Sequence, residues 1–140
     1  AVKQYKDITD SLGLELIRIT LPYELKKNEL TAINTFGIDT ELVVRGRIPL
    51  MVSEQCVRRT YDLCDKANGT IYIKDAKGQA NKVCSYCDYC YSVIYSDIYD
   101  ISKEDYSEIA PDYIRYESVD EECENMTGKV FDGHFNVGVE

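Results

Sequence analysis

Five cysteines within 35 residues are the side chains best suited to chemistry in this chain. They are Cys56, Cys64, Cys84, Cys87 and Cys90. A sixth, Cys123, stands well apart. Thiolates this close together can hold a soft metal or pair as disulfides. The cluster is therefore the first candidate for a functional site.

The spacing of these cysteines predicts a metal centre. Residues 84–90 hold three thiols at two-residue intervals, which iron–sulfur ferredoxins use because a tight loop then aims successive sulfurs at one cluster. Cys56 or Cys64 would supply the fourth ligand. Zinc would use the same thiols, pairing a Cys-x-x-Cys turn with two distant cysteines. Spacing alone leaves iron–sulfur and zinc open, with disulfides as a third alternative, and we expect Cys123 to be a free structural cysteine.

Three further side chains are candidates for binding a substrate. Arg45 and Arg47 flank Gly46 at the predicted end of a parallel strand, where βα barrels place their active sites, so they could hold an anionic group. A structural salt bridge is the alternative. His134, the single histidine, could be a general base or a ligand, and the alternative is a surface residue. Eight of the twelve tyrosines fall between Tyr86 and Tyr116, and we expect them to cover strand faces rather than line a pocket.

Composition limits the classes of protein to consider. With 44% apolar residues, residues 1–140 can form one domain with its own core, and no run of about 18 apolar residues is present to span a membrane. The net charge is −9, and the whole imbalance lies in residues 71–140. An acidic surface repels phosphate, so tight nucleic-acid binding by this chain alone is not expected.

The cysteines and the first residues bear on the cellular compartment. Two glycosylation patterns, at Asn68 and Asn125, are compatible with a secreted disulfide-bonded domain. The bunching of the thiols and the absence of an apolar region in residues 1–7 argue against that, so we expect a cytoplasmic protein. Residue 1 is alanine rather than methionine, so either the first residue has been processed or the chain is a piece of a longer one. We expect a piece, because the predicted βα units are too few for a complete barrel.

The elements predicted around these residues begin as a βαβ unit. A helix ends at Gly13, and a strand at 14–20, a helix at 22–37 and a strand at 41–45 follow. Such a unit implies parallel pairing. Residues 70–75 and 80–84 predict an antiparallel hairpin that turns at Gly78 and lies between the cysteines.

The parallel pattern resumes after the hairpin. We expect a short helix at 102–110, a strand at 112–117 and a short helix at 118–126. The predicted fold class is α/β: a partial (βα) barrel-like parallel sheet with a cysteine-bearing β-hairpin insertion. A complete barrel takes about 250 residues, so this chain would form only part of one.

Residues 41–56, which contain a Gly-Arg-x-Pro-Leu-Met run followed by a cysteine, resemble the signature of the collagenase-like peptidase family U-thirty-two. Segments 18–25, 73–78, 90–96 and 133–139 also fall in register with that family. The resemblance covers nearly the whole chain and matches the C-terminal half of the family's barrel. The chain departs from it at Pro22 and Tyr23, which replace the usual Ser-x, and it lacks the N-terminal half of the barrel.

The resemblance implies a four-iron four-sulfur cluster on four cysteines. Relatives so equipped support oxygen-independent hydroxylation of ubiquinone precursors or RNA bases, with prephenate as the oxygen donor. Cys56, Cys64 and Cys90 match family cysteines, whereas Cys84 and Cys87 fall where relatives vary. A second protein or a second copy would have to complete the barrel, and we expect the isolated half to be inactive.

Three functions follow for comparison with the structure. The first is an iron–sulfur protein that supports hydroxylation of RNA bases or quinone precursors. The second is a collagenase-like peptidase, which has little support because the sequence shows no nucleophile–base pair. The third is a zinc-stabilised module whose acidic, tyrosine-rich half binds a protein partner.

Overall fold

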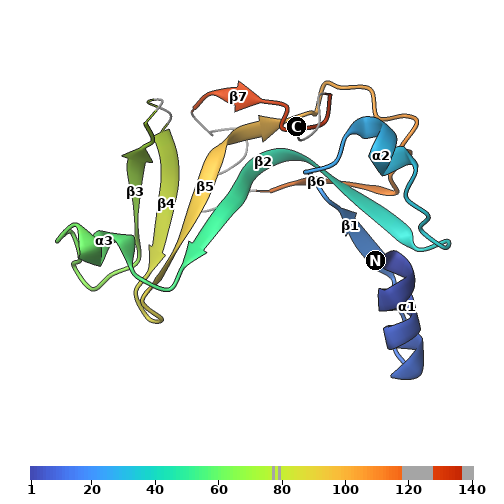
Figure 1. The fold of residues 1–140 in the computed structure, drawn as a ribbon, viewed down its shortest axis with the longest axis horizontal. Helices are drawn as coiled ribbons and strands as arrows, with labels where there is room; N and C mark the ends of the chain where they lie inside the picture. The colour runs from blue at the N-terminus through green and yellow to red at the C-terminus, as the bar shows by residue number, and fades with distance from the viewer. Residues whose placement is uncertain (77, 79, 118–127, 137–140) are drawn as a thin grey trace. The chain divides into compact units, whose positions relative to one another are not determined.

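A computed structural model describes residues 1–76, 78, 80–117 and 128–136 of the chain. Contacts between residues gather in two compact units. The first unit comprises Ala1–Gly46, Asp100–Glu117 and Asp132–Glu140, and the second comprises Arg47–Tyr99 and Ser118–Phe131. The long strand β2 (Asp39–Ser53) runs out of the first unit and into the second (Figure 1).

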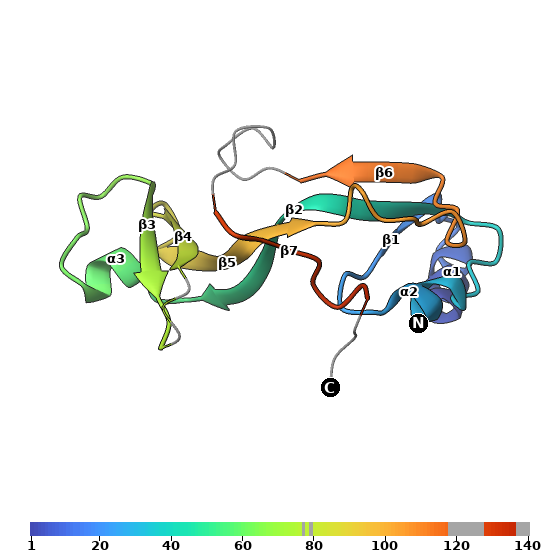
Figure 2. The same ribbon diagram turned by 90° about the horizontal axis from the view of Figure 1, so that it is seen from above.

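The first unit contains a small parallel sheet. The unit begins with helix α1 (Val2–Ser11), which is followed by strand β1 (Arg18–Leu21). Strand β1 pairs parallel with β2. Strand β6 (Tyr113–Tyr116) pairs parallel with the other side of β2 (Figure 2). The predicted parallel pairing of β1 and β2 and the predicted strand at 112–117 are therefore confirmed.

The second unit is an antiparallel meander. Strand β3 (Gly69–Lys74) pairs antiparallel with β4 (Ala80–Tyr86), which confirms the predicted hairpin. Strand β4 in turn pairs antiparallel with β5 (Tyr91–Asp100), a ten-residue strand that the sequence analysis did not anticipate. The short strand β7 (Val130–Phe131) lies parallel to β5, and helix α3 (Val57–Thr60) precedes the hairpin (Figure 1).

The predicted fold class is wrong. The described residues form a mixed sheet of seven strands, ordered β1-β2-β5-β4-β3 with β6 beside β2 and β7 beside β5. The helices within the described part have only ten, five and four residues. A (βα) barrel alternates each strand with a substantial helix, so this largely β structure is not part of a helix-rich α/β barrel.

Local hydrogen bonding explains why the expected helices are short or absent. Helix α2 covers only Lys27–Thr31 of the predicted 22–37. At its start the Glu29 side chain accepts the backbone N–H of Lys26, and beyond its end the Asn34 side chain accepts the backbone N–H of Phe36, which has a positive φ. In the predicted helix 102–110, Asp105 similarly bonds the backbone N–H of Ser107. The helix predicted at 118–126 lies outside the described residues.

Candidate thiol site

The β4–β5 turn presents two of the cysteines. The backbone N–H of Cys90 donates to the carbonyl of Cys87 at 3.3 Å, and Cys90 has a left-handed φ of 52°. The side-chain oxygen of Asn68 accepts the backbone N–H of Cys87 at 2.7 Å. A hydrogen-bonded Cys-x-x-Cys turn of this kind can aim two sulfurs at one metal.

Cys56 lies at the start of helix α3 and is 5% exposed. The pKa of its thiol is lowered, chiefly by a hydrogen bond from the backbone N–H of Arg59 and also by the hydroxyls of Ser85 and Ser92, which outweigh its burial. Those two hydroxyls lie 2.9 Å apart on β4 and β5. Cys56 is therefore held over these strands in an environment that favours the thiolate.

Cys64 and Cys87 come together although 23 positions separate them in the sequence. Cys64 is exposed on the loop between α3 and β3, and its side chain reaches that of Cys87. The pKa of the Cys87 thiol is raised, mainly by burial and further by the charges of Cys64 and Cys56, whereas Arg58 acts to lower it. Three thiols thus share one electrostatic environment.

Cys90 lines a cavity of about 370 Å³ beside α3 that Cys56 also lines. The cavity is lined by Glu54, Gln55, Cys56, Arg59, Thr60 and Cys90. We call Cys56, Cys64, Cys87 and Cys90 the thiol cluster. All four have free thiols, and within the described residues no group of three or more histidine, cysteine or acidic side chains is already arranged to hold a metal.

Cys84 does not join the thiol cluster. It is 5% exposed and packs in an apolar cluster with Val93 and Tyr95. Successive residues of a strand point to opposite faces, so Cys84 faces away from Ser85, which bonds Cys56. Cys123 lies outside the described residues.

The two arginines proposed to bind substrate both have structural partners. Arg45 forms an ion pair with Asp100, and its Nε is the one buried side-chain nitrogen or oxygen without a hydrogen-bond partner in the described part of the chain. Arg47 is 2% exposed and donates to the carbonyl of Ser96 at 3.2 Å. His134 is half-buried in the turn that follows β7.

The ion pair of Arg45 predicts a pH dependence of stability. Burial acts to raise the pKa of Asp100, but hydrogen bonds from Ser102 and the charge of Arg45 outweigh it, so the pKa lies below the ordinary 3.8. Such a carboxylate stabilises the fold above its unfolded pKa and loses that contribution as pH falls through the lower folded value. Below about pH 4, urea denaturation should show a steeper loss of unfolding free energy in the wild type than in Asp100→Asn.

The exposed Asp88 provides the control for this measurement. Asp88→Asn removes one carboxylate from the turn of the thiol cluster without touching Arg45. Its stability should fall with pH as steeply as that of the wild type. Identical pH profiles for Asp100→Asn and the wild type would contradict the assignment.

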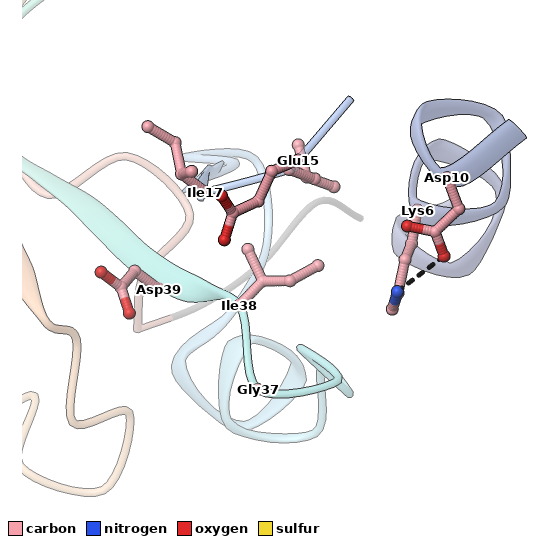
Figure 3. A pocket seen from close by; sticks show the side chains of 8 residues that line it. Lys6, Asp10, Glu15, Ile17, Gly37, Ile38 and Asp39 are labelled. Atoms are coloured by element: carbon pink, nitrogen blue, oxygen red, sulfur yellow. Dashed lines mark hydrogen bonds and ion pairs between the residues drawn. The ribbon is translucent and has the colours of Figure 1, made fainter. Parts of the chain in front are cut away.

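A second polar cavity, of about 390 Å³, lies in the first unit (Figure 3). Lys6 on α1 pairs with Asp10 at 2.7 Å in its wall, and Asp39 and Glu15 lie across from them. Because Lys6 is already paired within its own helix and the remaining charged groups are carboxylates, the cavity offers no matched set of groups for catalysis.

Six of the eight tyrosines between Tyr86 and Tyr116 lie on strands, whereas Tyr89 and Tyr106 do not. Tyr86 and Tyr91 stack at a centroid distance of 4.8 Å, and Tyr99 packs edge-on against Phe131 at 6.2 Å. Tyr95 lies in the same apolar cluster as Cys84. These rings cover the second unit's sheet, as expected for aromatic residues on half-buried strands.

Sequence reasoning missed two residues that organise the thiol cluster. Arg58 is 8% exposed, and its guanidinium interacts electrostatically with Cys64 and Cys87. Asn68, considered only as part of a glycosylation pattern, binds the backbone of Cys87. The only feature of the sequence that pointed to either residue was the short separation of Arg58 from Cys56. The contacts of Arg58 and Asn68 with the cysteine loops form only in the folded chain.

Comparison of the chain with protein-family models, curated proteins and solved structures finds no match. None of the helices among the described residues has the length and apolar character needed to cross a membrane.

Proposed function

We propose that the thiol cluster is a metal centre that holds a four-iron four-sulfur cluster. The observation that carries the proposal is that cysteines from three separate places approach one another: Cys64 of the loop before β3 interacts with Cys87 of the β4–β5 turn, and Cys56 at the start of α3 lines one cavity with Cys90. Free thiols gathered at one place without forming disulfides are typical of soft-metal ligands.

The donor chemistry of the site fits such a group. Four thiolates are the usual ligand set of a four-iron cluster and of structural zinc. The lowered pKa of Cys56 favours the thiolate that a metal requires. Burial raises the pKa of Cys87 and the charges of Cys64 and Cys56 raise it further, and a bound cation would relieve this repulsion. Because no described group yet surrounds a common point, the sulfurs must draw closer on binding.

The function proposed for this centre is support of oxygen-independent hydroxylation of RNA bases or quinone precursors. The proposal rests on the resemblance at residues 41–56 and on the cavity beside the cluster. When bound, an iron–sulfur cluster supplies electron transfer or redox activation. Arg59 and Thr60 line the same cavity as Cys56 and Cys90, so they would provide charge and hydrogen bonds to a small anionic reactant.

Metal analysis of anaerobically purified protein tests the metal centre. We expect broad visible absorbance near about 400 nm, with iron and sulfide in equal amounts. A colourless protein with one zinc per chain would replace this proposal with the zinc-stabilised interaction module. Protein without metal would overturn the metal centre altogether.

A further inference from the structure

We propose that Arg58 is the positioning residue of the thiol cluster, joining the Cys64 loop to the Cys87 turn. This inference rests on the proposed metal centre and identifies what prepares it. Arg58 is the second residue of α3, two positions after Cys56, so it shares a short helix with one proposed ligand. Its side chain extends from there to the loop that carries another.

The guanidinium of Arg58 is tied to that loop at two points. Its Nη2 lies 2.8 Å from Oδ1 of Asp65, and its Nη1 donates to the carbonyl of Ala67 at 2.7 Å. Asp65 also accepts the backbone N–H of Ala67 at 3.1 Å, which closes a compact turn immediately after Cys64. Arg58 therefore fixes the shape of the segment that presents Cys64.

One carbonyl connects Arg58 to the second loop. The oxygen of Ala67 accepts Arg58 Nη1 and also the thiol of Cys87, whose Sγ is 2.9 Å away. The adjacent Asn68 accepts the backbone N–H of Cys87. Loss of the guanidinium would release Ala67 and Asn68 together, and with them the contacts that hold Cys87 beside Cys64.

The charge of Arg58 reinforces this arrangement. Its side chain is only 10% exposed, so its positive charge is poorly screened by water, and it acts on both Cys64 and Cys87. Its ion-pair partner Asp65, by contrast, is 63% exposed. The positive charge of Arg58 therefore lies beside the loop that the guanidinium holds.

Gly69 provides the space that the guanidinium occupies. A Cβ added at Gly69 would lie 2.4 Å from Arg58 Nη1 and 2.9 Å from Cζ. Gly69 does not have a positive φ, so alanine can adopt its backbone conformation without strain. The added Cβ would instead displace the guanidinium of Arg58. Gly69→Ala is therefore an independent way to remove the same contact without changing Arg58.

Metal affinity of the reduced, metal-free protein tests the role of Arg58. Cobalt(II) is the probe, titrated against a chelator and followed by its thiolate charge-transfer absorbance. We expect Arg58→Gln and Gly69→Ala to weaken binding about 10- to 100-fold, as loss of outer-shell support usually does. Arg58→Lys keeps the positive charge but cannot bind Asp65 and the Ala67 carbonyl with two separate nitrogens, so we expect an intermediate loss of cobalt affinity.

Lys74→Gln is the control, because it removes one positive charge from an exposed side chain of β3 that does not line the cavity beside Cys56 and Cys90. Its affinity should stay within about 3-fold of the wild type, a difference small beside that expected at the outer shell. Equal losses in Arg58→Gln and Lys74→Gln would overturn the positioning role and indicate a general charge effect. Unchanged cobalt affinity in both Arg58→Gln and Gly69→Ala would overturn it as well.

Amide hydrogen exchange of the metal-free protein separates this inference from the proposed function. Arg58→Gln should speed exchange at the Cys87 amide, while the amides shared by β4 and β5 stay protected and show that the variant is folded. Unchanged exchange at Cys87 would overturn the positioning role even if the wild type binds metal. A wild type that binds no cobalt, with faster Cys87 exchange in the variant, would overturn the metal centre and support the link.

Discussion

Replacing Cys87 with serine should abolish stable metal binding by this protein. Cys87 contacts Cys64, lies within the electrostatic range of Cys56, and starts the turn that ends at Cys90. A serine hydroxyl remains protonated at neutral pH and is a hard oxygen donor, so it does not replace a thiolate toward iron or zinc. We expect bound metal to fall from near stoichiometric to undetectable, with affinity for cobalt(II) lowered by more than about 100-fold.

Cys84→Ala is the matched control for this prediction. It removes a thiol from the same strand region, but Cys84 packs in the apolar cluster rather than among the other cysteines. The variant should lose about 1 kcal/mol of unfolding free energy from a small cavity and should keep the metal. Loss of metal in Cys84→Ala and retention in Cys87→Ser would contradict the ligand set proposed from the structure.

The second large effect is expected at Gly46, the glycine of the Gly-Arg-x-Pro-Leu run. Its backbone lies against β6 and the residue that follows it: a Cβ there would be 2.6 Å from the carbonyl oxygen of Glu117 and 2.9 Å from its Cβ. Glu117 is held in place because its N–H donates to the carbonyl of Arg45 at 2.8 Å. Since backbone cannot move aside as a flexible side chain can, Gly46→Ala should destabilise the protein by about 2–3 kcal/mol in urea denaturation.

Gly78 in the β3–β4 turn distinguishes this close contact from ordinary glycine conformation. It has a φ of +79° and nothing within 4 Å of an added Cβ. Gly78→Ala should therefore cost about 1–2 kcal/mol, the penalty for a left-handed residue alone. If Gly46→Ala is no more destabilising than Gly78→Ala, the close approach of Glu117 is not what excludes a side chain at residue 46.

Several local elements could be predicted because their signals lie within a few residues. The hairpin at 69–86 combines β-branched residues with a glycine turn, and both were visible in the sequence. Strand β2 extends to Ser53, although a strand end was predicted at Gly46. Glycine usually interrupts a strand, but here the close approach of Glu117 requires it, and only the folded backbone brings Glu117 there.

The barrel prediction was wrong because helix signals were counted without the hydrogen bonds that compete with them. Apolar residues at 25–36 fit a helical face, yet the Asn34 side chain binds the backbone of Phe36 and α2 ends at Thr31. Strand β5 was missed because its alternation is weak: eight of its ten residues are buried. A strand covered on both faces lacks the polar side that marks a strand in sequence.

The amino-acid sequence alone predicted a clustered set of thiols suited to a soft metal. It could do so because ligand type and short spacing, such as Cys87 to Cys90, are properties of neighbouring residues. Which thiols meet depends on the tertiary structure, since Cys84 and Ser85 point to opposite faces of one strand. The tertiary structure also decided the part played by Arg58, whose contacts with Asp65 and Ala67 exist only when the loop folds back on α3.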